Sequence, residues 1–179
     1  MILPGKHIEK TIRLPVTVLR SEPATLSDQD VKEMLIKHNF YESEWNSKGN
    51  FENIFVDNED GTISDFKTGL MWQRDGSNDV MEHSDAIKYI DSLNKNNFAG
   101  YSDWRLPTLE ELASLLENKG KGGIYIDSVF NSDQRWCWSS DTRASSGAFN
   151  VTFYYGRVYS SNLFDSNYVR AVRSFPDND

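Results

Sequence analysis

Cysteine is nearly absent from this sequence: Cys137 is the single one among 179 residues. One cysteine cannot form a disulfide within the chain, so packing and hydrogen bonds must hold the fold. Because Trp136 and Trp138 flank it, we expect Cys137 to be a small buried hydrophobe. A functional thiol at this position is the alternative hypothesis.

Basic clusters and long apolar runs are also missing. Lys and Arg number 19 against 27 Asp and Glu, which gives a formal net charge of -8. This charge argues against a nucleic-acid partner and against attraction to anionic membranes. Residues 1–10 contain charged residues and lack the long apolar segment of a secretion signal, and no stretch is apolar enough to span a membrane. We therefore expect cytoplasmic synthesis without membrane insertion, which leaves particle-borne display and signal-independent export open.

Residues typical of catalytic or metal sites are few and scattered. His7, His38 and His83 lack zinc-type spacing, and no Gly-x-Ser-x-Gly nucleophile motif occurs. The acidic residues 57–65 do not fit a calcium-binding EF-hand, because Val56 stands where the first ligand should be; a hairpin turn is favoured there. No carboxylate pair is marked out for glycoside hydrolysis. We expect no enzyme, and we assign no catalytic residue, cofactor or metal ligand.

The residues that are present indicate a folded globular protein, with 38% hydrophobic and 13% aromatic residues. The length suits one sizeable domain with a small N-terminal attachment. We predict an N-terminal arm and short helix over residues 1–50, packed on a main domain over residues 51–175. The run 11–19 contains Pro15, which favours an edge strand or an arm that packs on its own domain or on a neighbouring subunit.

Local patterns predict several helices and strands. Ser27 is a candidate N-cap for a helix over 28–38, and Thr108 with Glu111 forms a candidate capping box for a later helix. Ser84 is a candidate cap for a helix that continues to about Lys95, and the apolar residues of this helix have helical spacing: Ala86, Ile87, Ile90 and Leu93. A hairpin is predicted over 51–65, and strands over 68–73, over 124–129 and from 136 onward. This segregated order favours the α+β class.

The stretch 135–173 is rich in Tyr, Ser and Asn. Tyr provides stiff, amphipathic contact area, and Ser and Asn adapt their hydrogen bonds, so this composition is typical of binding surfaces. The alternative is an ordinary solvated β-meander, because Tyr, Thr and Phe also favour strands.

Three stretches together carry a family resemblance. They are DGTISD at 60–65 with TGLMW at 68–72, WRLPT at 104–108 with Glu111 and Leu112, and WSS at 138–140 with VRAVR at 169–173. This combination resembles the C-terminal domain of the Legionella collagen-like adhesin, related to the formylglycine-generating-enzyme branch of the C-type lectin fold. The resemblance implies an α+β, C-type-lectin-like fold in which two helices flank small antiparallel β-sheets. It also implies scaffold roles for Trp104, Arg105, Arg170 and Arg173.

The resemblance has limits in its chemistry. Formylglycine-generating relatives need a pair of cysteines, whereas this chain has one. The Glu-Pro-Asn or Gln-Pro-Asp triplet of calcium-dependent lectins is absent. The adhesin resemblance suggests sulfated polysaccharides, yet the net negative charge opposes an anionic ligand unless Arg143 and Arg157 form a local basic spot.

The same C-terminal stretch resembles the variable regions of diversity-generating retroelement proteins, whose adenine-directed mutagenesis converts Asn codons into a restricted set of residues. Tyr, Ser, Asp, Phe, Leu and Arg belong to that set. The expected ligand-binding residues are Arg143, Asn150, Tyr154, Tyr155, Arg157, Tyr159, Ser160, Ser161, Asn162, Phe164, Asp165 and Ser166.

The main functional hypothesis is therefore a non-enzymatic recognition protein that binds a protein or glycan on a cell or particle surface. A calcium-independent carbohydrate-binding adhesin of fixed specificity is the alternative. A third hypothesis is a structural or assembly module whose N-terminal arm mediates docking or homo-oligomerisation.

Overall fold

The computed structural model describes residues 16–118, 123–144 and 147–175. The glycine-rich turn predicted around residues 119–123 therefore lies almost entirely outside the described residues. Most of the predicted arm also lies outside the described residues, so the hypothesis of assembly through that arm stays a prediction. Where the run 11–19 is described, it forms no regular strand, and the Thr17 backbone N–H donates to the Lys67 carbonyl oxygen at 2.8 Å.

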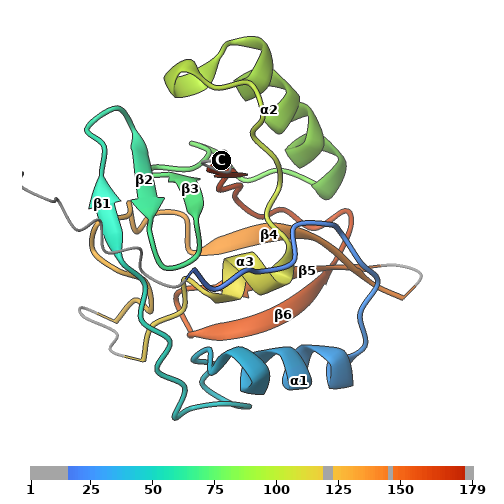
Figure 1. The fold of residues 1–179 in the computed structure, drawn as a ribbon. Helices are drawn as coiled ribbons and strands as arrows, with labels where there is room; N and C mark the ends of the chain where they lie inside the picture. The colour runs from blue at the N-terminus through green and yellow to red at the C-terminus, as the bar shows by residue number, and fades with distance from the viewer. Residues whose placement is uncertain (1–15, 119–122, 145–146, 176–179) are drawn as a thin grey trace, which may run out of the picture.

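The α+β class is confirmed, and the described residues form helices and two small antiparallel sheets (Figure 1). The helices are α1 (Asp28–His38), α2 (His83–Lys95), the 3-10 turn η1 (Phe98–Gly100) and α3 (Leu109–Ala113). The four-stranded sheet has the order β1 (Phe55–Asp57), β2 (Thr62–Asp65), β3 (Leu70–Gln73) and β7 (Val172–Ser174). The three-stranded sheet has the order β4 (Trp136–Arg143), β5 (Gly147–Thr152) and β6 (Arg157–Asn162). The arrangement is compatible with the C-type-lectin-like fold that the resemblance implies.

Two of the three predicted helix caps are confirmed. Ser27 accepts from the Asp30 backbone at the start of α1, and Thr108 accepts from the Glu111 backbone at the start of α3. Each cap satisfies a backbone donor that has no partner within the helix.

The predicted Ser84 cap of α2 is wrong, because Ser84 lies within the helix and the N-cap is Glu82, whose side chain forms no cap hydrogen bond. The predicted apolar face of α2 is also partly wrong. Ala86 and Ile90 are buried, but Ile87 is 53% exposed. Ala86 and Ile90 lie one turn apart on the inner side, whereas Ile87 is rotated by about 100° from Ala86 and so leaves that side.

The predicted hairpin over 51–65 is confirmed in its central part, where β1 pairs with β2. The predicted strand over 124–129 is wrong. The Asp127 side chain accepts from the Val129 backbone N–H at 2.8 Å, and the Phe130 N–H donates to the Asp127 carbonyl oxygen. These contacts fold the segment into a turn, since an Asp side chain competes for backbone donors.

The three-stranded sheet separates the two apolar clusters of the core. On one side, leucines of α3 and residues of α1 pack with Phe149, Val151 and Val158. On the other side, Ile90 of α2 and Trp104 pack with Trp138. Figure 1 shows α3 across the front of this sheet and α1 running below β6. The sheet is therefore held from both sides over much of its area.

A buried carboxylate joins the N-terminal segment to the rest of the molecule. Asp141 of β4 is fully buried and accepts from both terminal nitrogens of Arg20, at 2.8 and 2.6 Å. It also accepts from the backbone N–H groups of Ala24 and Leu109, both at 2.7 Å. Asp141 thus ties residues 20–24 and the first turn of α3 to the three-stranded sheet.

The predicted scaffold arginines are confirmed. Arg170 is fully buried and donates to the backbone carbonyls of Gln73 and Asn131, both at 2.9 Å. Arg173 forms a two-point contact with Asp103, and Arg105 forms one with Glu111. These forked contacts need the planar guanidinium, so lysine is no substitute here.

Candidate functional site

Strand alternation decides which of the predicted site residues share a surface. Trp136, Thr152 and Arg157 are direct neighbours across β4, β5 and β6. Direct neighbours point to the same side of a sheet, as does every second residue along a strand. Tyr159 therefore lies on the side of Trp136 and Arg157, whereas Val151 and Val158 point to the opposite side, into the core that contains α3.

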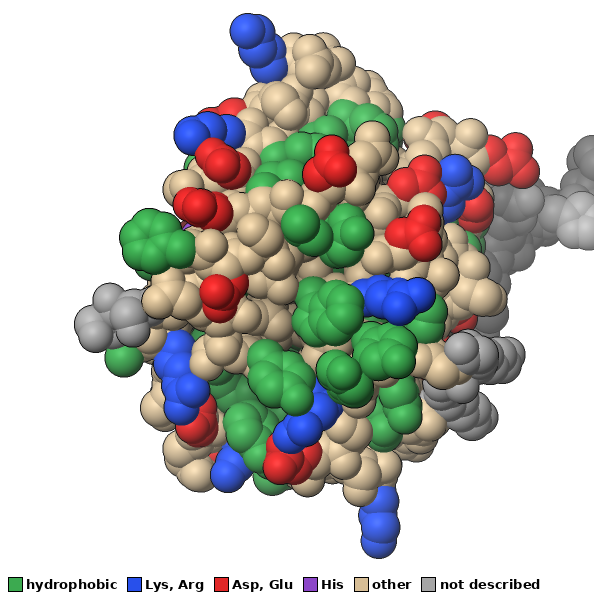
Figure 2. All heavy atoms as spheres, turned by 180° about the vertical axis from the view of Figure 1, so that it is seen from behind, with side chains coloured by type: hydrophobic (Ala, Val, Ile, Leu, Met, Phe, Trp, Pro, Cys, Tyr) green, Lys and Arg blue, Asp and Glu red, His purple; other side chains and the backbone are tan. Residues whose placement is uncertain are grey.

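Aromatic rings gather on the side away from α3. The Tyr154 and Tyr155 rings lie 4.7 Å apart, and each contacts the Trp136 ring, at 6.0 and 6.4 Å. Tyr154, Tyr155 and Tyr159 are 41%, 51% and 40% exposed. Figure 2 looks onto this side and shows hydrophobic side chains, Tyr included, gathered over its lower half with Lys and Arg among them. We call this surface the tyrosine face and define it as Arg135, Trp136, Tyr154, Tyr155, Arg157 and Tyr159.

Two guanidinium groups lie over these rings. The Arg135 guanidinium is 5.4 Å from the centre of the Tyr154 ring, and that of Arg157 is 5.1 Å from the centre of the Tyr159 ring. Cation–π contacts of this kind favour an ordered ring position. Arg157 is also ion-paired with Glu44 and lies near the buried Glu42. The charge of Arg157 is therefore largely compensated within the protein.

The hairpin between β5 and β6 is fixed where it carries Tyr154 and Tyr155. Gly156 has a φ of +66°, and a Cβ atom there would lie 2.7 Å from Cγ of Tyr125. The Gly156 carbonyl oxygen accepts from the Ser43 N–H at 2.9 Å. A side chain is excluded on both grounds, so glycine allows the hairpin to dock closely on the residue 41–45 loop.

Glu42 holds that loop together from beneath the hairpin. Its carboxylate accepts from the backbone N–H groups of Glu44 and Trp45, at 2.9 and 2.6 Å. Burial raises the pKa of Glu42, and the hydrogen bonds from Trp45 and Val158 oppose that effect. The loop and the tyrosine face are thus joined by a buried polar contact.

Asn150 does not belong to an exposed surface, so that prediction is wrong. It is 1% exposed and donates through Nδ2 to the Ser161 hydroxyl at 2.8 Å. Asn150 lies on the central strand β5, and neighbouring side chains cover it. Its role is to position half-buried Ser161.

Arg143 and Arg157 do not form the local basic spot that an anionic ligand would need. Arg143 donates to Asp28 of α1 at 2.6 Å and to the Ser160 hydroxyl at 2.9 Å. Arg143 and Ser160 thus lie on the α1 side of the sheet, opposite the tyrosine face. Both arginines have carboxylate partners, which removes the local excess of positive charge.

The remaining predicted residues form the exposed turn that follows β6. The Asp165 carboxylate accepts from the Asn162 backbone N–H at 2.9 Å, and the Asn162 side chain accepts from the Phe164 N–H at 3.1 Å. Phe164 is 79% exposed, and Ser166 is exposed as well. This turn is a second exposed segment, distinct from the tyrosine face.

Sequence patterns alone did not identify Arg135, Trp136 and Glu44 as part of the site. Trp136 resembled scaffold, because it stands beside two buried residues in a hydrophobic run. Only its register opposite Thr152 places it on the exposed side. No local pattern marks Glu44, which reaches Arg157 through tertiary packing.

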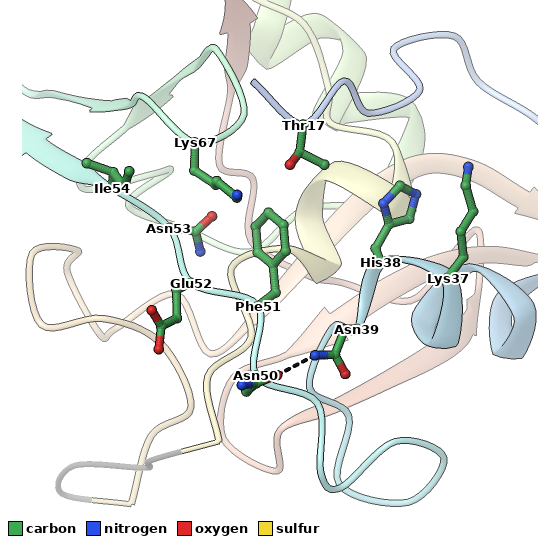
Figure 3. Close-up of a pocket in the computed structure, with 10 residues that line it drawn as sticks. All are labelled: Thr17, Lys37, His38, Asn39, Asn50, Phe51, Glu52, Asn53, Ile54 and Lys67. Atoms are coloured by element: carbon green, nitrogen blue, oxygen red, sulfur yellow. Dashed lines mark hydrogen bonds between the residues drawn. The ribbon is translucent and has the colours of Figure 1, made fainter. Parts of the chain in front are cut away.

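A recess of about 650 Å³ lies away from these residues, between the end of α1, residues 50–54 and Lys67 (Figure 3). Most of the residues that line it are polar, and the Lys67 ammonium lies 5.9 Å from the centre of the Phe51 ring. His38 at its border is 3.0 Å from the Glu110 carboxylate, and burial lowers the pKa of this imidazole. The recess combines segments distant in sequence, so no motif predicted it.

The expectation that Cys137 is buried is confirmed. Its side chain is fully buried, and burial raises the pKa of the thiol to about 11. Such a thiol carries almost no thiolate at neutral pH. Within the part of the chain that the structure describes, no helix is long and apolar enough to cross a membrane.

Comparison with known proteins places the chain in a family. The family model of the Lcl C-terminal domain matches residues 61–173, from the β1–β2 turn into β7, which is more than half of the chain. A search of curated proteins finds no match. The matched region contains the three-stranded sheet and the whole tyrosine face. The chain therefore belongs to the Lcl C-terminal domain family.

Proposed function

We propose that this protein is a non-enzymatic recognition module whose tyrosine face binds a protein or glycan on the surface of a cell or particle. Family membership supports an adhesin-like or binding role in general. The observation that carries the specific proposal is the exposed group of Tyr154, Tyr155 and Tyr159 on one side of a sheet whose other side is core.

The physical argument rests on preorganisation. Tyrosines have few rotatable bonds, and here their rings contact Trp136 and the two guanidinium groups. A surface that is ordered before binding loses little conformational entropy on binding. Buried, inert Cys137 supports the non-enzymatic part of the proposal.

The test is substitution of the face without damage to the fold. We expect Tyr155→Ala and Tyr159→Ala each to weaken capture by about thirtyfold, which is the effect of a binding hot spot. The melting temperature should fall by less than about 2 °C, because both side chains are about half exposed and lie outside the core clusters. Probes are a glycan array and an array of cell-surface proteins.

Phe66→Ala is the matched control, because Phe66 is an aromatic residue of similar exposure, 48%, in the β2–β3 turn. It should retain full capture. A large loss of melting temperature in the tyrosine variants would place these rings in the core, and unchanged capture would remove the tyrosine face from binding.

Diversification of this surface is the finer part of the proposal. Tyr154, Tyr155 and Tyr159 match the residues that adenine mutagenesis produces and are exposed, whereas the neighbouring Phe153 and Val158 are buried. Exposed variable positions between buried constant ones would let the ligand change while the fold stays. Deep sequencing of the gene across a population should show variation confined to the exposed codons. An invariant stretch would instead favour an adhesin of fixed specificity.

A further inference from the structure

A second, smaller recess lies within the family region and is separate from the tyrosine face. It measures about 330 Å³ and lies between Gly61 of the β1–β2 turn, the end of β3 with the residues that follow it, α2 and η1. Its polar lining includes Gln73, Asp75, Asn78 and Tyr89, and its apolar lining includes Leu93 and Phe98. The volume is at the lower end of the range for small-molecule sites.

The Gln73 side chain has a defined orientation in this recess. One end of its amide lies 3.2 Å from the Gly76 carbonyl oxygen, which can only accept, so that end is Nε2. The other end lies 3.3 Å from the Ala171 backbone N–H, which can only donate, so that end is Oε1. Gln73 is buried between these two backbone groups and cannot turn over.

This orientation fixes the role of Tyr89. Gln73 Nε2 also donates to the Tyr89 phenol oxygen, at 2.6 Å. The phenol oxygen is therefore the acceptor, and its own proton is directed elsewhere. Within the described ranges, Gln73 is the one hydrogen-bond partner of this hydroxyl. Burial raises the pKa of Tyr89, so the proton is retained at neutral pH. Tyr89 thus offers a hydrogen-bond donor beside the recess.

The rest of the lining complements this donor. The Asp75 carboxylate is half-exposed and contacts Arg74 at 3.3 Å, and Asn78 is exposed. The partly buried Phe98 is held in place because its carbonyl oxygen accepts from the Trp104 indole N–H at 3.1 Å. Its ring lies over Gly61, where an added Cβ would be 3.4 Å away. The recess therefore combines a donor, a carboxylate and an amide with an apolar wall.

We propose that this recess is a second binding site, which takes a single pyranose ring of a neutral sugar. A pyranose presents hydroxyls that both donate and accept, together with an apolar C–H face that suits Phe98. Anionic ligands are disfavoured, because Asp75 and Asp57 both lie at Arg74, which leaves this corner with a net negative charge.

The test is an NMR titration of the full chain with the methyl pyranosides of glucose, galactose, mannose and N-acetylglucosamine. We expect saturable shifts at the Gly61 and Gly76 amides and the Asn78 side chain with at least one of them, at millimolar affinity. Tyr89→Phe keeps the ring and removes the hydroxyl, both as a donor to the sugar and as an acceptor from Gln73. Gln73 stays held by the Gly76 and Ala171 backbone groups, so the variant should weaken sugar binding about tenfold. Phe98→Ala should weaken it similarly.

Tyr168→Phe is the matched control, since it removes the hydroxyl of another half-buried tyrosine that does not line the recess. It should bind as the unaltered chain does. Absence of saturable shifts with all four sugars would overturn the proposal, as would unchanged affinity in Tyr89→Phe. Tyr155→Ala separates this site from the tyrosine face, because it should weaken capture there and leave the sugar titration intact.

Discussion

At the scale of single residues, a comparison of two glycines with positive φ distinguishes the cost of backbone strain from the cost of steric overlap. Gly156 at the β5–β6 hairpin has a φ of +66°, and an added Cβ would overlap Tyr125. Gly100 at the end of η1 has a φ of +83°, and an added Cβ would meet nothing within 4 Å. The two positions share the backbone cost of any side chain but differ in the space around it.

We predict that Gly156→Ala destabilises the protein much more than Gly100→Ala does. Left-handed backbone costs a non-glycine residue on the order of 1 kcal/mol at both positions. Overlap with Tyr125 adds about 1–3 kcal/mol at Gly156, because the tightly packed hairpin has to move. Urea unfolding of both variants measures the difference in the free energy of unfolding.

Ligand capture gives this prediction a second measurement. Displacement of the hairpin should move Tyr154 and Tyr155, so Gly156→Ala should also weaken capture, whereas Gly100→Ala should not. Equal losses of stability in the two variants would show that the hairpin is free to relax, and that close docking on Tyr125 does not fix the tyrosine face.

At the scale of elements, local signals were predictable and tertiary contacts were not. The starts of α1 and α3 followed from Ser27 and Thr108, because a cap is a short-range hydrogen bond between neighbours in sequence. The segment 124–129 looked like a strand by its apolar residues, but Asp127 captures nearby backbone donors and turns the chain. The hydrogen bonds of one polar side chain thus make this segment a turn, although its apolar residues predict a strand.

The candidate site shows the same division. Tyr154, Tyr155 and Tyr159 were predictable as exposed residues from composition and alternation. Asn150 was not predictable as buried, because its burial depends on β5 being the central strand of its sheet. The partner of Arg143 lies on α1, 115 positions away in sequence. Strand order and long-range pairing are properties of the whole fold, and the local patterns of a single sequence do not predict them.

At the scale of the whole molecule, the family region and the N-terminal segment share one core. The family model begins at residue 61. Nevertheless Val31, Leu35 and Phe40 are fully buried in the same cluster as the leucines of α3. Burial of three such side chains contributes about 5–9 kcal/mol. That amount is comparable with the entire stability of a typical domain, about 5–15 kcal/mol.

We predict that a fragment containing residues 51–175 does not fold stably alone, whereas a fragment containing residues 16–175 keeps the contacts of Arg20 and α1 and folds. The fragment loses those apolar contacts and also loses Arg20, which leaves Asp141 buried without its cation, at a cost of about 3–5 kcal/mol. Poor dispersion of NMR amide signals in the fragment alone would confirm this expectation. A cooperative melt of residues 51–175 near the temperature of the full chain would instead show an autonomous domain with residues 16–50 as an attachment. Asp141 and the contacts of α1 determine the outcome, because they join the two parts of the chain. If residues 51–175 were an autonomous domain, adding Arg20 and α1 as a separate peptide would not change the stability of the fragment.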